Sequence, residues 1–510
     1  MPDATAMAVR DGVVAWIGRD DVARVQFPDA TITDLDGGFV APAFVDCHFH
    51  TTATGLTLTA LDLRQARSRT ECLQLVAEYA RTHPDGVVWG HGWDETLWPE
   101  RAAPTTAELD AAVGDRLAYL TRVDVHSAAA STALRHRAEL HTADPQAPLA
   151  ADDHHRVRRA ARAALSATQR DRARRAALDA AAAAGIAAVH ECAGPDVSGL
   201  DDWRELRDLG HGVEVVGYWG EAVATADEAR DLLRSTGAHG LAGDLFVDGS
   251  LGSHTAWLHE PYCDAPETTG NSYLDIDAVT AHLAACTEAG ITAGFHVIGD
   301  AAVATVVTAL QRVVDRFGSV AVARCGHRLE HLEMVTAEQA ALLGRWGVIA
   351  SVQPSFDALW GGEDGMYAQR LGPARARELN PFALLASEGV PLALGSDSPV
   401  TDLNPWAGVR AATTHHTPGS AISARAAFAA ATRGAWRAGG VRDGVSGTLV
   451  PGAPATYAVW DAGEFEVTAP ADAVQRWSTD PRSRVPVLPA LHDQFPRCRQ
   501  TVHRGVTVHG

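Results

Sequence analysis

Eight short apolar segments, several of them followed by helix-like stretches, constrain the fold more than any other feature of this sequence. Helix-like patterns such as Ala278–Glu288, Ala301–Phe317 and Thr336–Trp346 lie between them. The alternation favours a parallel sheet of the α/β class, and eight units favour a closed (β/α)8 TIM barrel. The predicted strands are Phe44–His48, Ala187–Glu191, Val213–Tyr218, Asp244–Asp248, Thr292–His296, His327–His331, Val348–Gln353 and Leu392–Asp397.

The two chain ends share a different pattern. Strand-like residues flank the turn signal Asp11-Gly12, and the C-terminal TVHRGVTVHG has a similar turn near Arg504-Gly505. A further strand, ATYAVWD, ends at Asp461. We predict one composite β-domain from residues 1–42 and 445–510, and a barrel from 43–56 and 185–444; two unrelated hairpins are the alternative.

The interval between the first two predicted strands is too long for one crossover connection. Residues 57–184 therefore form a predicted insertion, which we expect to cover the barrel mouth. Its Arg/Ala-rich run, 156–184, is interrupted by Asp171 and Asp179. This pattern is more typical of a solvated helix face than of a nucleic-acid-binding arm.

Composition excludes several classes of partner. The 510 residues have a formal net charge of −20, which disfavours binding to nucleic acid or to anionic membranes. No apolar run is long enough for a membrane span, and the N-terminus does not resemble a signal peptide. The seven cysteines are scattered. We therefore predict a cytoplasmic protein with reduced thiols.

Metal-capable side chains end several of the predicted strands. His48 and His50 alternate along one strand, so both point to the same side. The carboxyl ends of barrel strands surround the active site in TIM-barrel enzymes. Each residue alone is a weak signal, but together they predict a metal site. The predicted metal ligands are His48, His50, His296, His331 and Asp397.

Ordered motifs across nearly the whole chain resemble the amidohydrolase superfamily. They are APAFVDCHFH, FVDGSLGSHTA, HVIGD, HRLEH, SVQPSFD and LGSDSPV. The branch that they resemble most contains the N-substituted formamide deformylases (amidohydrolase family 3). The resemblance implies the same five metal ligands, with Asp397 and His331 also catalytic. It further implies a small-molecule substrate and allows a homodimer.

The resemblance also implies a reaction. A divalent metal ion would activate water to attack a carbonyl carbon and cleave a carbon–nitrogen bond of an amide, formamide or N-acyl compound. Asp397 would take a proton from the water and pass it to the departing nitrogen. Imidazole and carboxylate ligands suit zinc, while iron, manganese and cobalt stay open.

One position departs from the family pattern. Relatives often carry a carbamylated lysine that bridges two metal ions, where this chain has Asp244, and the chain contains no lysine at all. An extended strand would place Asp244 roughly 13 Å below Asp248, at about 3.3 Å per residue. We therefore expect Asp244 not to reach the site and one ion per chain to bind, with Glu191 or Asp248 as candidates for a second-metal ligand.

Six further residues are predicted to contact substrate, and loop packing is the alternative for each. Asp248, Ser253 and His254 follow the fourth predicted strand, and His254 replaces an arginine that is usual in relatives. Gln353 ends the seventh strand. Trp93 and His126 belong to the insertion.

Two other functions stay open. A mononuclear deaminase of heterocyclic amines would use a similar ligand set, but relatives place a glutamate three residues after the fifth-strand histidine. This chain has Gly299 there, followed by Asp300. A non-catalytic ligand-binding barrel is the second alternative.

Overall fold

A computed structural model describes residues 4–123, 127–141, 143–466 and 484–510. The chain forms two compact units. The first combines Met1–His50 with Asp179–Gly510, and the second is Thr51–Leu178. Each unit has its own sheets and its own hydrophobic core.

The first unit is built around two parallel sheets, with strand orders β11-β10-β4 and β12-β13-β14-β15. β4 and β10 are buried along their whole length, as strands covered on both faces are. The strands are β4 (Phe44–Phe49), β10 (Ile186–Ala193), β11 (Glu214–Trp219), β12 (Gly294–Val297), β13 (Arg328–His331), β14 (Ile349–Val352) and β15 (Leu392–Leu394).

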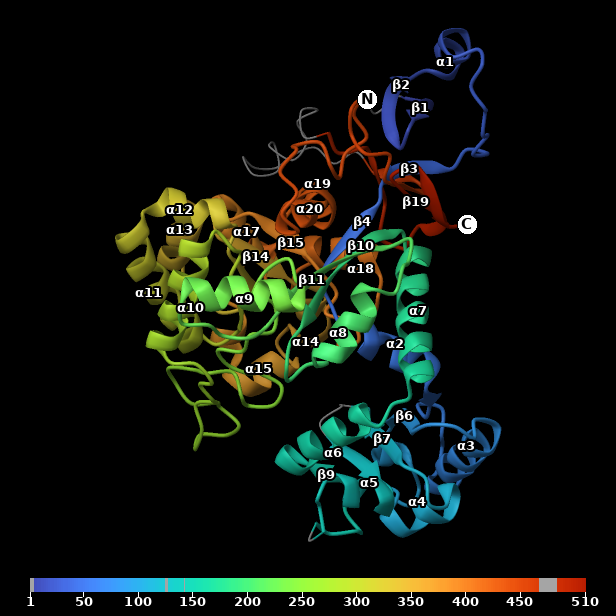
Figure 1. The fold of residues 1–510 in the computed structure, drawn as a ribbon, viewed down its shortest axis with the longest axis vertical. Coiled ribbons are helices and arrows are strands. Elements are labelled where there is room, and N and C mark those ends of the chain that lie inside the picture. Colours follow the sequence, from blue (N-terminus) through green and yellow to red (C-terminus); the bar gives the residue numbers. More distant parts are fainter. Residues whose placement is uncertain (1–3, 124–126, 142, 467–483) are drawn as a thin grey trace. The chain divides into compact units, whose positions relative to one another are not determined.

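Helices follow most of these strands, and Figure 1 shows α9 to α13 on their outer side. α11 buries Val303, Val306 and Leu310 at the spacing of one helix face. The three helices named from the sequence are confirmed as α10, α11 and α13. The helices are α8 (Leu200–Arg207), α9 (Ala226–Thr236), α10 (Ile276–Ala289), α11 (Asp300–Phe317), α12 (Ser319–Cys325), α13 (Ala337–Trp346), α14 (Pro354–Trp360), α15 (Met366–Leu371), α16 (Pro373–Ala376), α17 (Phe382–Ser387), α18 (Pro405–Thr413), α19 (Ala424–Ala429) and α20 (Ala435–Ala438).

The prediction of a regular strand at Asp244–Asp248 is wrong. The chain makes isolated parallel bridges there, Gly240 with Tyr218, Leu241 with Ala293 and Phe246 with His296. Between the bridges it bends at Gly243, whose φ of +77° interrupts an extended strand. Another isolated bridge joins Phe49 to Ser398. These bridges connect the edges of the two parallel sheets.

Strands from both chain ends form a four-stranded antiparallel sheet of order β20-β19-β16-β3. They are β3 (Phe39–Pro42), β16 (Tyr457–Asp461), β19 (Arg497–His503) and β20 (Val506–His509). The predicted N-terminal hairpin is confirmed as β1 (Ala6–Arg10) and β2 (Val13–Gly18), followed by α1 (Asp20–Gln26). Asp11 and Gly12 both have positive φ values, as its tight turn requires. A short pair, β17 (Phe465–Glu466) with β18 (Leu488–Pro489), completes the described strands of the first unit.

The second unit contains a five-stranded mixed sheet, with the order β5-β6-β7-β8-β9 (Figure 1). One hydrophobic cluster contains Trp89 and Tyr119, and another contains Trp93 and Leu120. Alternation along β7 sends Tyr119 and Leu120 into different clusters, whereas in β6 a register shift between His91 and Trp93 separates Trp93 from Trp89. The elements are α2 (Thr51–Thr59), β5 (Leu61–Asp62), α3 (Arg69–Thr82), β6 (Val88–Trp93), α4 (Thr106–Val113), β7 (Ala118–Arg122), β8 (Ser127–Ala130), α5 (Thr132–Arg137), β9 (Leu149–Ala150), α6 (Ala151–Ala163) and α7 (Ala167–Ala183), the last of which crosses the unit boundary.

None of the helices in the described ranges is long and apolar enough to cross a membrane.

Candidate metal centre

His48 and His50 lie at the end of β4 and face the same two carboxylates. His48 Nε2 lies 3.5 Å from Asp244 Oδ1 and 3.5 Å from Asp397 Oδ1. His50 Nε2 lies 3.2 Å from Asp244 Oδ2 and 3.1 Å from Asp397 Oδ1. The alternation of side chains along an extended strand accounts for this shared direction.

His296 and His331, from the ends of β12 and β13, approach the same aspartate. Asp244 Oδ1 lies 3.4 Å from His296 Nδ1 and 4.0 Å from His331 Nε2. The structure therefore brings together all five predicted metal ligands. His331 and Asp397 both have left-handed backbones, with φ values of +70° and +54°. Such conformations are uncommon outside glycine, and they redirect both side chains where the strands end.

Asp244 lies among these histidines, so the expectation that it could not reach the site is wrong. The expectation assumed an extended strand from Asp244 to Asp248, whereas this segment forms only an isolated bridge at Phe246 and follows a bend at Gly243. The close packing of this bend leaves little room, since a Cβ atom on Gly220 would lie 2.7 Å from the Asp244 carbonyl. Asp244 is 7% exposed. Asp244 therefore lies at the centre of the cluster.

Several donor atoms in the cluster are buried and have no hydrogen-bond partner among the described residues. They include His48 Nε2, Asp244 Oδ1, His296 Nδ1 and Asp397 Oδ1. Leaving buried polar atoms unpaired is costly, so their convergence points to a missing partner. Imidazole nitrogens and carboxylate oxygens are the ligands that Zn²⁺ and related divalent ions use. The residues present therefore fit a divalent metal ion.

The opposite nitrogen of three histidines is fixed by a second contact. His48 Nδ1 lies 2.9 Å from Glu330 Oε2, and His331 Nδ1 lies 2.8 Å from Gln353 Oε1. His296 Nε2 lies 3.1 Å from the carbonyl oxygen of Gly249. An N–H donated to each acceptor leaves the other ring nitrogen free to bind a metal ion. Gln353, predicted to contact substrate, therefore orients His331.

Burial and neighbouring charges shift the pKa values of the histidines and of Asp244 in the cluster. Burial lowers the pKa of His50, but the carboxylates of Asp244 and Asp397 outweigh burial and raise it to about 10. Burial, together with the proximity of His296 and His48, lowers the pKa of His331 to about 3. Burial would raise the pKa of Asp244, yet the nearby histidines hold it well below its usual value. The cluster thus favours positive charge beside the two carboxylates.

Sequence reasoning missed the buried pair Arg328 and Glu330. The Arg328 Nη2 atom donates to Glu330 Oε2 at 2.9 Å, and Arg328 Nη1 lies 3.1 Å from His190 Nδ1. Cys192 Sγ also approaches His48 Nδ1, at 3.5 Å. Both residues of the pair are fully buried. The motif HRLEH could have indicated this pair, because Arg328 and Glu330 lie two residues apart in a predicted buried strand. Charged residues are rarely buried unless they are paired.

Asp248 stabilises a loop through hydrogen bonds with backbone N–H groups. Its carboxylate accepts hydrogen bonds from the backbone N–H groups of Trp257 (2.9 Å), Ile298 (3.0 Å) and Gly299 (2.8 Å). Burial raises the pKa of Asp248 to about 6. Its oxygens are thus engaged with the backbone, as the loop-packing alternative expects.

Three other predicted contact residues have local partners. Ser253 Oγ lies 2.6 Å from Thr255 Oγ1, and His254 Nε2 lies 2.9 Å from Asp264 Oδ1. Trp93 is fully buried and donates its Nε1–H to the carbonyl of Leu120 within the second unit.

Two predictions concern residues away from the described cluster. His126 lies outside the described residues. Glu191 is buried in β10 but belongs to none of the metal-capable groups among the described residues. Side chains alternate along β10, and the residues that approach the cluster are its neighbours His190 and Cys192. The structure therefore does not bring Glu191 to the donor atoms.

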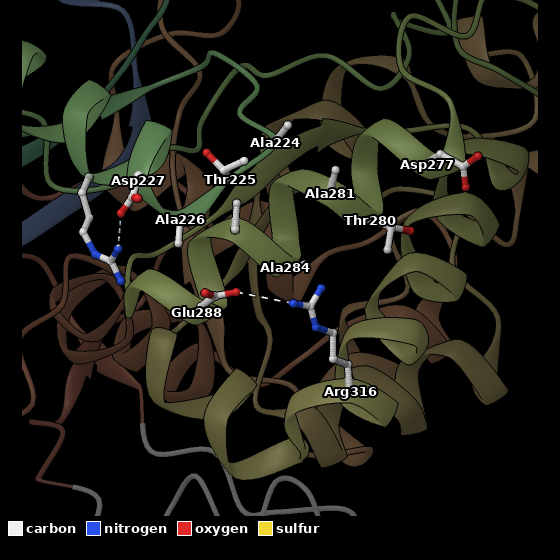
Figure 2. Close-up of a pocket in the computed structure, with 12 residues that line it drawn as sticks. Ala224, Thr225, Ala226, Asp227, Asp277, Thr280, Ala281, Ala284, Glu288 and Arg316 are labelled. Atoms are coloured by element: carbon white, nitrogen blue, oxygen red, sulfur yellow. Dashed lines mark hydrogen bonds and ion pairs between the residues drawn. The ribbon is translucent and has the colours of Figure 1, made fainter.

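A separate hollow is lined by α9, α10 and α11 (Figure 2). Its charged residues pair locally, Asp227 with Arg230 at 2.8 Å and Glu288 with Arg316 at 3.5 Å. None of its lining residues belongs to the histidine cluster.

Comparisons with known proteins identify the family of this chain. A family model described as "Amidohydrolase family" matches residues 31–509. "Protein LONG AFTER FAR-RED 3" of Arabidopsis thaliana is 27% identical over 518 residues, covering 92% of this chain and 87% of that protein. "N-substituted formamide deformylase" of Arthrobacter pascens is 28% identical over 134 residues, covering 26% of this chain and 25% of that protein.

A solved structure is also similar. The crystal structure of an uncharacterized metal-dependent hydrolase from Pyrococcus furiosus matches with a TM-score of 0.73 and 25% identity, covering 89% of this chain and 94% of that chain. This match supports a TIM-barrel-like α/β fold. The superfamily resemblance predicted from the motifs is confirmed by the family match. The chain therefore belongs to the amidohydrolase family, and it is a metal-dependent hydrolase.

Proposed function

We propose that this protein hydrolyses a carbon–nitrogen bond in an amide, formamide or related N-acyl compound, using metal-activated water. The observation that carries the proposal is the convergence of four histidines and two aspartates, in which His48 Nε2, His296 Nδ1, Asp244 Oδ1 and Asp397 Oδ1 are buried without a hydrogen-bond partner among the described residues. We propose His48, His50, His296, His331 and Asp397 as metal ligands. Nitrogen and oxygen donors of this kind suit Zn²⁺, which we propose as the native ion.

A bound divalent metal would polarise the substrate carbonyl and lower the pKa of water. The side chains supply positioning and proton transfer. Asp397 keeps one buried oxygen without a hydrogen-bond partner, beside His48 and His50. We assign to it the proton taken from the attacking water and delivered to the departing nitrogen. We propose that His331, oriented by Gln353, contributes to catalysis through the metal ion that its Nε2 atom would hold.

We propose that the two parallel sheets close into a (β/α)8 barrel. The isolated bridges of Gly240, Leu241 and Phe246 on one side, and that of Phe49 with Ser398 on the other, support closure. The sheet of β3, β16, β19 and β20 supports a composite β-domain from residues 1–42 and 445–510. Residues 43–56 and 185–444 would form the barrel, and 57–184 the insertion.

We still predict that substrate is contacted by Ser253, His254, Trp93 and His126. A homodimer is a separate prediction. We propose a cytoplasmic location because all seven cysteines are free thiols, as a reducing compartment would keep them.

No specific observation favours the deaminase. Gly299 supplies no side-chain acid, and Asp300 Oδ1 accepts the backbone N–H of His259 at 2.9 Å. That contact ties the Asp300 carboxylate to the loop rather than leaving it to shuttle protons.

A paired screen of the zinc-loaded protein tests the proposal. Amine release from N-formyl and N-acyl amines would be measured beside ammonia release from amino-heterocycles. We expect amine release that a chelator abolishes and added zinc restores. Ammonia release alone would establish the deaminase instead, and a fully loaded protein inactive on both panels would favour the binding barrel.

A further inference from the structure

We propose that Asp244 is a shared ligand that allows this site to hold two divalent metal ions. The proposal rests on the proposed function and deepens it, because it replaces the single ion expected from the sequence. The Asp244 carboxylate faces histidines from both sides of the cluster: Oδ2 lies 3.2 Å from His50 Nε2, and Oδ1 lies 3.4 Å from His296 Nδ1 and 3.5 Å from His48 Nε2.

The donor atoms form overlapping groups rather than one set. One group contains His48, His50 and Asp244, another contains Asp244, His296 and His331, and a third contains His48, His331 and Asp397. Asp397 lies beside His48 and His50. Asp244 is the residue common to the first two groups. We therefore assign one ion to His48, His50, Asp244 and Asp397, and the other to Asp244, His296 and His331.

A single ion cannot bind all of these donor atoms at once. Bonds from Zn²⁺ to nitrogen or oxygen are about 2.0–2.2 Å long, so the ligand atoms of one ion lie within about 4.4 Å of one another. Within each group the ligand atoms lie within 4.8 Å of one another. Among the described residues, no such group contains both His50 and His296. Two metal positions that share the Asp244 carboxylate would use all of these donor atoms.

Asp244 also lacks a competing partner. Its ion pairs among the described residues are with histidines of the cluster, and its Oδ1 atom is buried without a hydrogen bond. Glu191, the bridge considered from the sequence, belongs to neither group. The carboxylate oxygens of Asp248 already accept hydrogen bonds from three backbone N–H groups. Asp244 is therefore the carboxylate positioned to bridge.

The assignment has a consequence for assembly of the site. A lysine must react with carbon dioxide before it can bridge two ions, and this chain contains no lysine. A carboxylate is ready to bind as soon as the protein folds. Loading of both ions should therefore be independent of carbon dioxide.

The test is metal stoichiometry of the full-length protein. Chelator-stripped protein would be reloaded with Mn²⁺, in buffer freed of carbon dioxide and in buffer with bicarbonate, and bound manganese measured by elemental analysis. We expect two ions per chain in both buffers, and one or fewer in Asp244→Asn. Glu191→Gln, which removes a buried carboxylate on the neighbouring strand β10, serves as the matched control and should keep both ions.

Electron paramagnetic resonance of the wild-type protein provides a second readout that needs no variant. Two Mn²⁺ ions that share a carboxylate should give an exchange-coupled spectrum, whereas a lone ion gives the uncoupled six-line signal. One ion at saturation, two ions that need bicarbonate, or two coupled ions in Asp244→Asn would each overturn the proposal. Hydrolysis by a protein holding one ion would overturn it while leaving the proposed function intact; two coupled ions without hydrolysis would do the reverse.

Discussion

Glu330 Oε2 lies 2.9 Å from His48 Nδ1, on the side of the imidazole opposite the carboxylates of the metal centre. The same carboxylate pairs with Arg328, and all three side chains are fully buried. The contact fixes which ring nitrogen of His48 faces Asp244 and Asp397, and it would increase the basicity of His48 toward a bound metal ion.

Glu330→Gln should therefore weaken metal binding. The amide keeps the size of the side chain but loses the charge that pairs with both His48 and Arg328. We expect the metal affinity to fall by roughly 10–100-fold, measured by competition with a chelator. Glu338→Gln, on the exposed first turn of α13, should leave it unchanged. Wild-type affinity in folded Glu330→Gln would show that His48 needs no such support.

Gln353 offers a test between two roles. Its Oε1 atom accepts from His331 Nδ1 at 2.8 Å, so Gln353→Ala should lower metal affinity by about 10-fold or more. Gln353→Glu keeps an acceptor and should restore binding. If the residue instead contacts substrate, as the sequence suggested, Gln353→Ala would raise KM at unchanged metal affinity.

Asp397→Asn should separate metal binding from turnover. The amide oxygen can still contact an ion, but the side chain no longer accepts a proton. We expect kcat to fall about 10²–10⁴-fold at unchanged zinc content, measured by steady-state kinetics and elemental analysis. Asp402→Asn, at an exposed site, is the control. Normal turnover in Asp397→Asn would remove it as the proton carrier.

Asp248→Asn should act on stability. An amide nitrogen cannot accept the backbone N–H groups that Asp248 now holds, so at least one buried donor loses its partner. We expect the free energy of unfolding to fall by about 1–3 kcal/mol, measured by chemical denaturation. KM should stay the same. A higher KM at unchanged stability would return Asp248 to the substrate pocket.

Glu333 predicts a pH dependence of stability. Burial raises its pKa from 4.5 to about 7, so between these values the native carboxyl stays protonated while the unfolded one ionises. The native state then holds more protons, and stability falls as pH rises through this window. Glu333→Gln removes that slope. The free energy of unfolding of the variant should gain about 3 kcal/mol relative to wild type between pH 4.5 and 7. A pH-independent difference would contradict the raised pKa.

Local pattern was enough to predict much of this protein. Apolar segments predicted seven regular parallel strands among the described residues, and the turn residues Asp11 and Gly12 predicted the first hairpin. His48 and His50 were placed together because side-chain alternation is a property of any strand. Together with His296, His331 and Asp397, they gave a ligand set whose side chains the structure brings together. Neighbouring residues alone determine such features.

Only the tertiary structure decided the roles of Asp244, Gln353 and Glu330. The segment from Asp244 to Asp248 pairs with its neighbours through an isolated bridge instead of a regular strand, and Asp244 lies beside His50 and His296. Gln353 and Glu330 gain their roles from histidines on other strands. Asp248 is engaged by N–H groups about fifty residues away in the chain. Contacts between distant segments form only on folding, so periodicity and spacing could not predict them.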